Sequence, residues 1–241
     1  MQLEPIEYLQ GSLSLIYIII SLILGIFILL KYFEHKNPNL VYVGLTWILI
    51  SFPWLCDATS FLMILILGVP LSEMAYLTLV NAFIPLTFIV WFMAFTNLLY
   101  KENQKLIIAF LAIFAVIFEI IFFYVLFTNT AQIGSLVSPF HAEYSLFIQV
   151  YLFLSMTIFL ITGIIFGKES LKSENPEIKL KGKLLILAFI SFFIGALLEA
   201  LFTLNAVLLV ITRSILILSA IEFYGGFTLP DWMKKLLLKN E

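Results

Sequence analysis

The sequence predicts an all-α membrane protein, a single domain over residues 1–241 in which seven transmembrane helices form a bundle. Of its 241 residues, 63% are hydrophobic and 12% are charged, and the mean hydropathy is +1.12. A soluble domain of this size has about 25% charged residues. Long uncharged stretches recur, and lysines occur in every second connection between them. We therefore expect a multi-pass protein of the cell membrane, surrounded by the lipid bilayer.

Each expected span has about 20 apolar residues, the number that crosses about 30 Å of hydrocarbon. The spans are expected near residues 8–30, 40–67, 74–100, 106–127, 144–166, 184–203 and 206–227. The last two come from one stretch, Leu184–Phe227, which as a single helix would be about twice as long as the membrane is thick. We therefore expect a turn at Thr203–Asn205. Pro53 and Pro85 predict kinks in the second and third spans, because proline frees a backbone carbonyl one turn earlier.

The lysines predict the orientation of the bundle, because cytoplasmic connections hold most of the Lys and Arg. All twelve fall on one side of a seven-span arrangement: Lys31, Lys36, Lys101, Lys105, Lys168, Lys172, Lys179, Lys181, Lys183, Lys234, Lys235 and Lys239. The N-terminus is therefore expected outside and the C-terminus inside. Tyr76 and Tyr144 are then expected near the outer interface, where amphipathic rings settle.

Two cytoplasmic segments are candidate contacts for a protein partner. Gly167–Lys183 reads as a loop that mixes Lys and Glu, with a break at Asn175-Pro176. The tail, residues 228–241, is expected to form a short interfacial helix capped by Thr228, with Trp232 and Leu236 on one face. On the outer side, residues 128–143 read as a loop.

Ionisable residues within the spans predict a site, because a charge inside the bilayer costs about 2.5–3.5 kcal/mol even on the lenient insertion scale. The polar residues expected in the outer half of the bilayer are Asp57, Asn81, Glu119, Gln149, Glu199 and Arg213. Stripes of small residues next to Glu119 and Glu199 allow close helix approach. We predict a partly hydrated cavity bounded by the second, third, fourth, sixth and seventh spans.

Arg213 is the only arginine of the chain, and a guanidinium stays ionised and pairs with carboxylates. Its counter-ion is expected among Asp57, Glu119 and Glu199. Glu199 is the simplest partner because both residues lie close to the same turn. The pair alone could serve only to clamp two helices together. As a site, the cavity suits a small cationic or zwitterionic ligand, and an open Arg213 would suit a carboxylate.

Several classes are excluded by missing features. A net charge of −2 does not fit nucleic-acid binding, and Cys56 has no second cysteine to pair with. No span contains the lysine that would hold retinal. His35 and His141 lie on opposite sides, so no metal site is expected. Without a nucleophile elbow either, we expect no enzyme activity and no cofactor.

The exit from the seventh span runs Glu222-Phe-Tyr-Gly-Gly-Phe-Thr-Leu-Pro-Asp-Trp232. In this exit and in its topology, the chain resembles uncharacterised archaeal-type seven-helix membrane proteins of prokaryotes and the seven-helix sensor regions of histidine kinases. The resemblance implies a sensor. Since this sequence contains no kinase domain, we expect the signal to pass to a separate cytoplasmic protein.

Three functions stay open at this point. The first is a sensor or receptor-like module with a ligand in the outer cavity. The second is a small transporter or channel, in which spans one to three repeat as spans five to seven and Asp57 corresponds to Glu199. The third is a structural subunit without a ligand. Few polar residues continue toward the cytoplasm below Asp57, which favours the sensor.

Overall fold

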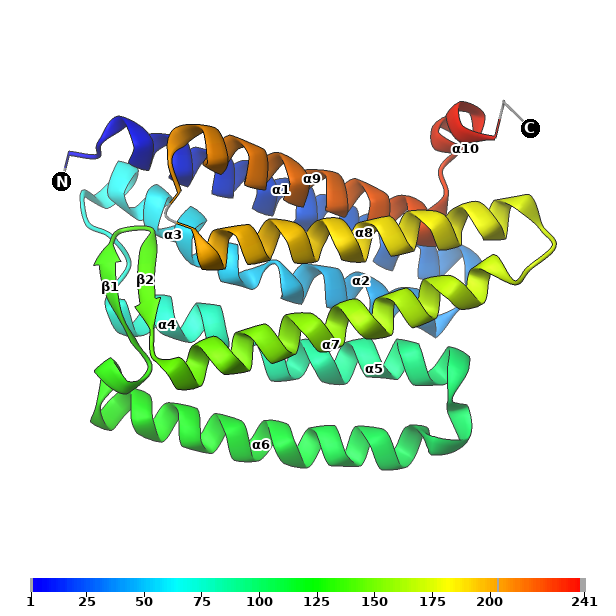
Figure 1. Ribbon diagram of the computed structural model, residues 1–241, viewed down its shortest axis with the longest axis horizontal. Coiled ribbons are helices and arrows are strands. Elements are labelled where there is room, and N and C mark those ends of the chain that lie inside the picture. The colour runs from blue at the N-terminus through cyan, green and yellow to red at the C-terminus, as the bar shows by residue number, and fades with distance from the viewer. Residues whose placement is uncertain (1, 203, 239–241) are drawn as a thin grey trace.

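Helices make up most of the chain in this computed structural model, which describes residues 2–202 and 204–238. In chain order (Figure 1) the elements are α1 (Pro5–His35), α2 (Pro38–Ile50), α3 (Phe52–Leu67), α4 (Glu73–Asn81), α5 (Ile84–Leu99), α6 (Gln104–Thr128), β1 (Gly134–Ser138), β2 (His141–Tyr144), α7 (Leu146–Leu171), α8 (Pro176–Leu201), α9 (Ala206–Thr228) and α10 (Asp231–Leu237). Short 3-10 helices at Lys101–Asn103 and Thr130–Gln132 flank α6. The predicted all-α class is confirmed, with one small β-hairpin added.

Six helical segments of the described residues are long and apolar enough to cross a membrane. They are α1, the unit α4–α5, α6 with its preceding turn, α7, α8 and α9. Helices α2 and α3 are long and apolar enough only when taken together, and they are bent by 52° where they meet. These lengths fit a multi-pass membrane protein.

The helix breaks lie where the prolines predict kinks. Pro53 and Pro85 are each the second residue of a helix, α3 and α5, that follows directly on another helix. Because proline has no N–H, it cannot continue the hydrogen-bond ladder of the preceding helix but fits the first turn of a new one. The helix expected as the second span is thus broken at Ser51, and the one expected as the third is broken at Ala82 and Phe83.

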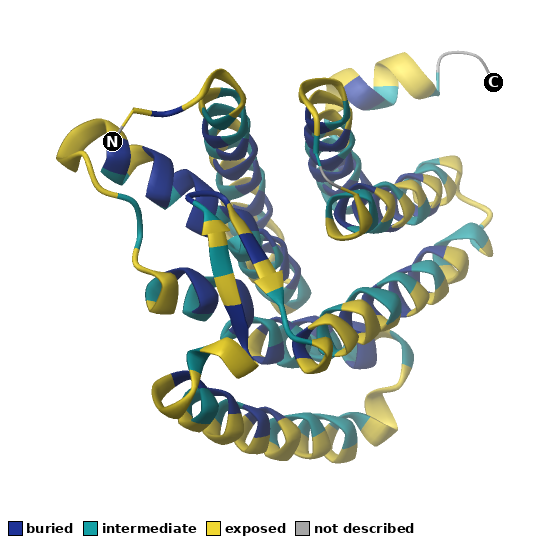
Figure 2. Ribbon diagram, turned by 60° about the vertical axis from the view of Figure 1, so that its left-hand side comes forward, coloured by how far each residue is buried: buried dark blue, intermediate teal, exposed yellow. Residues whose placement is uncertain are grey.

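The long helices pack in a ring, and α6 lies outside it. Going around, α1 packs against α2 and α3, α2 against α5, α5 against α7, α7 against α8, α8 against α9, and α9 against α1. The main helix partner of α6 is α5. Its large apolar side chains, such as Phe110, Ile113 and Ile120, are therefore exposed, and α6 forms the edge of the bundle (Figure 2).

The two ends of the bundle carry different elements (Figure 1). We call the end with β1 and β2 the hairpin end, and the end with α10 the tail end. All described lysines lie toward the tail end, in the α1–α2, α5–α6 and α7–α8 connections with their flanking turns or in α10. Lys239 lies outside the described residues.

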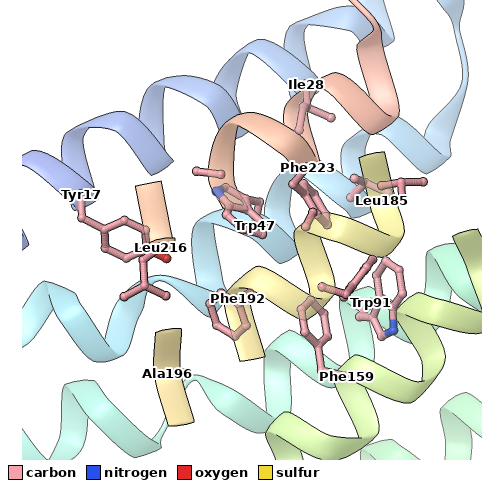
Figure 3. Packing of buried hydrophobic residues seen from close by; sticks show 14 of the residues in the cluster. Tyr17, Ile28, Trp47, Trp91, Phe159, Leu185, Phe192, Ala196, Leu216 and Phe223 are labelled. Carbon is pink, nitrogen blue, oxygen red and sulfur yellow. The ribbon is translucent and has the colours of Figure 1, made fainter. Parts of the chain in front are cut away.

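Aromatic side chains fill the core between the helices (Figure 3). Trp47 stacks on Phe223 with ring centroids 4.3 Å apart, and Trp91 meets Phe189 at 5.2 Å. Trp47, Trp91 and Phe223 are almost fully buried. Aromatic pairs of this kind add about 0.5–1.5 kcal/mol to the free energy of burial.

Glycines bring two pairs of helices into backbone contact toward the tail end. A Cβ on Gly44 of α2 would lie 2.8 Å from the carbonyl oxygen of Gly25 in α1. Likewise, a Cβ on Gly182 of α8 would lie 2.7 Å from the carbonyl oxygen of Gly167 in α7. Any residue other than glycine would require a shift of the backbone at these crossings. Small residues allow the same close approach at interfaces between membrane helices.

The connection at residues 128–143, predicted as a loop, contains most of the β-hairpin. Strands β1 and β2 pair antiparallel, with Gly134 opposite Tyr144 and an irregularity near the turn. The side chain of Leu136 is half-buried whereas Ser135 is exposed, and Ile133 and Ala142 are buried in the second apolar cluster. Apolar and polar residues alternate only weakly in this short segment, so the sequence alone does not indicate strands. Packing against the bundle stabilises them.

The connections at the tail end are shorter than predicted. Most of Gly167–Lys183 is helical, and only residues 172–175 separate α7 from α8. Lys and Glu have helix propensities close to that of Leu, so a charged segment can continue a helix. Asn175 and Pro176 start α8 as cap and first residue, and the Asn175 side chain accepts the N–H of Glu177 at 2.9 Å.

The predicted tail helix exists as α10, but its cap differs from the prediction. Pro230 is the N-cap, whereas Thr228 ends α9 and donates its hydroxyl to the carbonyl of Tyr224. Trp232 and Leu236 are both exposed, as an interfacial face requires. The predicted turn between the last two spans lies between Leu201 and Ala206, and Thr203 itself is outside the described residues.

Candidate functional site

Three ionisable side chains meet near the hairpin end. Nη2 of Arg213 in α9 lies 3.2 Å from Oδ2 of Asp57 in α3. Nη1 of the same side chain lies 2.9 Å from the carboxylate of Glu199 in α8. We call Asp57, Glu199 and Arg213 the ionic cluster. The sequence left the counter-ion of Arg213 open, and the structure gives it two.

Local sequence places each member. The Asn205 side chain accepts the N–H of Leu208 at 2.9 Å and so starts α9, which brings Arg213 level with Glu199 near the end of α8. Asp57 reaches Arg213 from α3, which follows the bend at Ser51. The predicted Glu199–Arg213 pair is therefore present, and the break before Pro53 adds the second acid.

Uncharged donors complete the contacts of the two carboxylates. The hydroxyl of Tyr76 donates to Oδ1 of Asp57 at 2.6 Å, and Oγ of Ser14 lies 3.2 Å from Oδ2. The indole Nε1 of Trp54 donates to Oε2 of Glu199 at 2.7 Å. Sequence reasoning missed these donors, since Tyr76 was expected at the interface. The spacing of Trp54 three residues before Asp57, on one helix face, was the available signal.

The ionic cluster is withdrawn from solvent. Arg213 and Asp57 are 1% and 4% exposed, and the side chain of Glu199 is 14% exposed. At such burial charge interactions are strong, and charges are stable only when paired and hydrogen-bonded. Two carboxylates share one guanidinium, so the cluster carries a net negative charge when all three are ionised. Nε of Arg213 has no hydrogen-bond partner among the described residues.

A cavity of about 760 Å³ adjoins the ionic cluster. All three members line it, together with apolar side chains of α4, α5, α7 and α8 and with residues 140–144 of the hairpin. Gln10 of α1 also lines the cavity, and its Nε2 donates to the carbonyl of Phe140 at 2.8 Å. The hairpin thus lies over one wall of the cavity.

Aromatic rings separate the cavity from the tail end. Phe159 and Phe192 line it and belong to the same buried cluster as Trp47 and Phe223. Phe192 lies beside Trp54, with ring centroids 5.7 Å apart (Figure 3 shows Phe192 and its neighbours). Apolar rings therefore lie between the ionic cluster and the tail end.

The other three predicted site residues lie apart from the ionic cluster. Asn81 is fully buried, donates to the carbonyl of Leu77 at 2.9 Å, and is not among the described residues that line the cavity. Glu119 is on α6, outside the ring, and its Oε2 has no hydrogen-bond partner among the described residues. Gln149 lines the cavity but is exposed, and donates to the carbonyl of Tyr144 at 2.8 Å.

The predicted walls of the cavity are wrong in one respect. The fourth span, α6, was expected to bound it, but the described lining comes from α7 and the hairpin instead. The small-residue stripe before Glu119 suggested an inward face. Because α6 packs mainly on α5 at the edge of the bundle, that face does not reach the ring interior.

The arrangement offers an incoming cation two carboxylates already held by neutral donors. Among the described residues, no three or more of His, Cys, Asp and Glu are placed to hold a metal ion. The contacts that these three side chains make are ion pairs centred on Arg213. Comparisons with family models, with curated proteins and with solved structures give no match to this chain.

Proposed function

We propose that this protein is a membrane-embedded sensor, with seven spans, that binds a small cationic or zwitterionic ligand in a cavity open to the outside. The seven spans are the six long apolar segments and the bent pair α2–α3 taken as one. The lysines at the tail end support a cytoplasmic position for that end, because cytoplasmic connections hold most of the Lys and Arg. The plasma membrane is then the expected location, and the hairpin end is external.

One observation carries the proposal: a buried arginine shared by acids from two other spans forms part of a cavity wall. A ligand cation that approaches Asp57 or Glu199 competes with Arg213 for the same oxygens. Each ion pair holds α9 to a different helix. A ligand can shift an equilibrium only by its different affinity for two states, and this exchange of partners provides such a difference.

A change in the ion pairs of Arg213 would be transmitted to the cytoplasm along α9, which runs from the ionic cluster to the tail end. There α10 follows α9 directly, and Lys234 of α10 pairs with Glu177 at the start of α8. Met233 is buried against Leu184 and Leu229. A movement of α9 against α8 therefore alters the position of α10. The surface formed by α10 and residues 167–183 is the proposed contact for a separate cytoplasmic protein.

A distance measurement tests the sensor. The full chain in lipid nanodiscs carries spin labels at Glu174→Cys and Lys235→Cys, both exposed. The probes are glycine and a series of alkylammonium ions from ethyl to decyl. At least one probe should change the distance distribution, and the change should be lost in Glu199→Gln but retained in Glu222→Gln. An unchanged distribution with every probe would overturn the proposal.

A second function, transport, is favoured by the repeated glycine contacts. A Cβ on Gly25 would meet Cγ1 of Ile48 at 2.6 Å, and a Cβ on Gly167 would meet Cγ1 of Ile186 at 2.6 Å. Each Ile follows its partner glycine, Gly44 or Gly182, by four residues. Spans one and two thus cross as spans five and six do, which matches two three-span units joined by α6.

Flux decides between these two functions. Proteoliposomes that contain the full chain are supplied with radiolabelled methylammonium, and uptake is compared with that of empty vesicles. The sensor predicts no uptake above the empty vesicles. Uptake that is lost in Asp57→Asn would favour the transporter.

A further inference from the structure

The cavity next to the ionic cluster reaches the side of the bundle. Val150, Phe153 and Leu154 of α7 and Leu201 of α8 line the cavity, yet they are 49%, 50%, 52% and 66% exposed. A residue that is both exposed and part of the lining marks a place where a cavity meets the surface. We call these four residues the portal.

The portal lies where α7 and α8 separate. Toward the tail end the two helices touch at Gly167 and Gly182, and Figure 1 shows them diverging toward the hairpin end. The last turn of α8 and the first turns of α7 therefore leave the cavity open between them. If the bundle spans a membrane, this opening faces the hydrocarbon of the outer leaflet and is lined by side chains suited to it.

The charges around the cavity favour a cation. The acids of the lining are Asp57, Glu143 and Glu199, and its one arginine is Arg213. His141 and Glu143 of β2 are exposed and lie at the hairpin side of the cavity, beside exposed Gln149. The lining is thus polar and acidic next to the hairpin, and apolar at the portal.

From these observations we infer that the ligand is an amphiphilic organic cation, and that it enters from the membrane through the portal. This inference rests on the proposed function, since it names the ligand of the same cavity. The cationic head contacts Asp57 and Glu199, and the hydrocarbon chain lies between α7 and α8. A small polar cation would use only the acidic part and leave the apolar lining of a 760 Å³ cavity without a partner.

Photolabelling tests the inference. The full chain in nanodiscs is exposed to a decylammonium ion with a diazirine at the chain end, and the labelled peptides are identified by mass spectrometry. We expect labels on residues 146–154 and 197–201 that excess decylammonium removes. Ethylammonium, decanol and decanoate should each need at least about ten times the concentration for the same competition, a factor of ten that corresponds to about 1.4 kcal/mol.

Matched variants separate the portal from lipid exposure in general. Leu201→Trp narrows the portal, and Ile120→Trp makes the same kind of change on α6, where the residue is 65% exposed and not part of the lining. Leu201→Trp should reduce the competed label at least fivefold, and Ile120→Trp should leave it unchanged. Glu199→Gln should also abolish the competed label.

The outcomes distinguish the two levels of the proposal. If ethylammonium competes as well as decylammonium, or if Leu201→Trp has no effect, entry of an amphiphile through the portal is wrong and the sensor proposal stands. Equal competition by decanoate would overturn the preference for a cation. If no probe competes and no probe changes the spin-label distances, the proposed function fails as well.

Discussion

Helices α7 and α8 pack closely toward the tail end and lie apart toward the hairpin end. Toward the tail end, Gly167 and Gly182 bring the two backbones into contact. Toward the hairpin end the helices diverge (Figure 1), and residues of both line the cavity. Close contact needs no polar group, because dispersion alone stabilises it. At the hairpin end the ion pairs of Arg213 hold α8 and α3 to α9, and among the described residues no ion pair joins α7 to α8.

The two ends of the bundle differ in how easily the packing of their helices can change. Glycine contacts have one good geometry, since any shift loses many short contacts together. A guanidinium that pairs with two acids can keep one ion pair when the other is lost. We therefore expect the tail-end crossings to act as fixed points, and the ionic cluster to be the place where a ligand alters the packing.

Arg213→Ala should have the largest effect, because it leaves Asp57 and Glu199 buried without a cation. Removing one partner of a buried pair costs about 3–5 kcal/mol in soluble proteins. The free energy of unfolding, measured by denaturant titration in mixed micelles, should fall by that order. Binding of the alkylammonium probes should change as well.

The matched control is Glu222→Gln, on the same helix but close to its tail end. Glu222 is half-buried and takes no part in the ion pairs of the described residues. Its substitution should change the free energy of unfolding by less than about 1 kcal/mol. If Arg213→Ala and Glu222→Gln are tolerated equally, the ionic cluster does not hold the helices together.

Much of this comparison was predictable from the sequence. The even spacing of apolar stretches and lysines gave the long helices, because membrane spans need a minimum apolar length. Glu199 and Arg213 were predictable as a pair, since both lie within a few residues of one turn. Pro53 and Pro85 marked the broken helices through their missing N–H.

The rest depends on packing that periodicity does not encode. Glu119 and Asn81 are polar residues within apolar stretches, as Asp57 is, but α6 packs outside the ring and Asn81 bonds within its own helix. The hydrogen bonds of Trp54 and Tyr76 join residues far apart in the chain. The hairpin at 134–144 is stabilised by tertiary contacts, and strand propensity in such short segments is decided by context.

Gly182→Val should have the second largest effect. Its Cβ would lie 2.7 Å from the carbonyl oxygen of Gly167, so α7 and α8 must separate. Overpacking of this kind costs about 1–3 kcal/mol. Ala200→Val is the control at the open end of the same helix, where the residue is exposed and lines the cavity, and it should change the free energy of unfolding by less than about 0.5 kcal/mol. Equal losses for the two variants would contradict the contrast between the ends.

The smallest expected effect concerns the hairpin, which is attached to the bundle by few polar contacts. Gln10→Leu removes the bond from Nε2 to the carbonyl of Phe140, which joins α1 to the hairpin. A hydrogen bond of this kind contributes about 0.5–1.5 kcal/mol. Backbone amides of β1 and β2 should exchange about threefold to tenfold faster with deuterium, and amides near Gly182 should keep their rates.

Gln149→Leu is the matched control for this change. It removes a bond of the same length, to the carbonyl of Tyr144, but between residues five apart in sequence. Because α7 follows β2 directly, the chain itself keeps these groups close, and hairpin exchange should rise less than in Gln10→Leu. If both variants speed exchange equally, the bond between Gln10 and Phe140 is no more important for hairpin stability than the bond beside α7. The contact with α1 would then not be what holds the hairpin against the cavity.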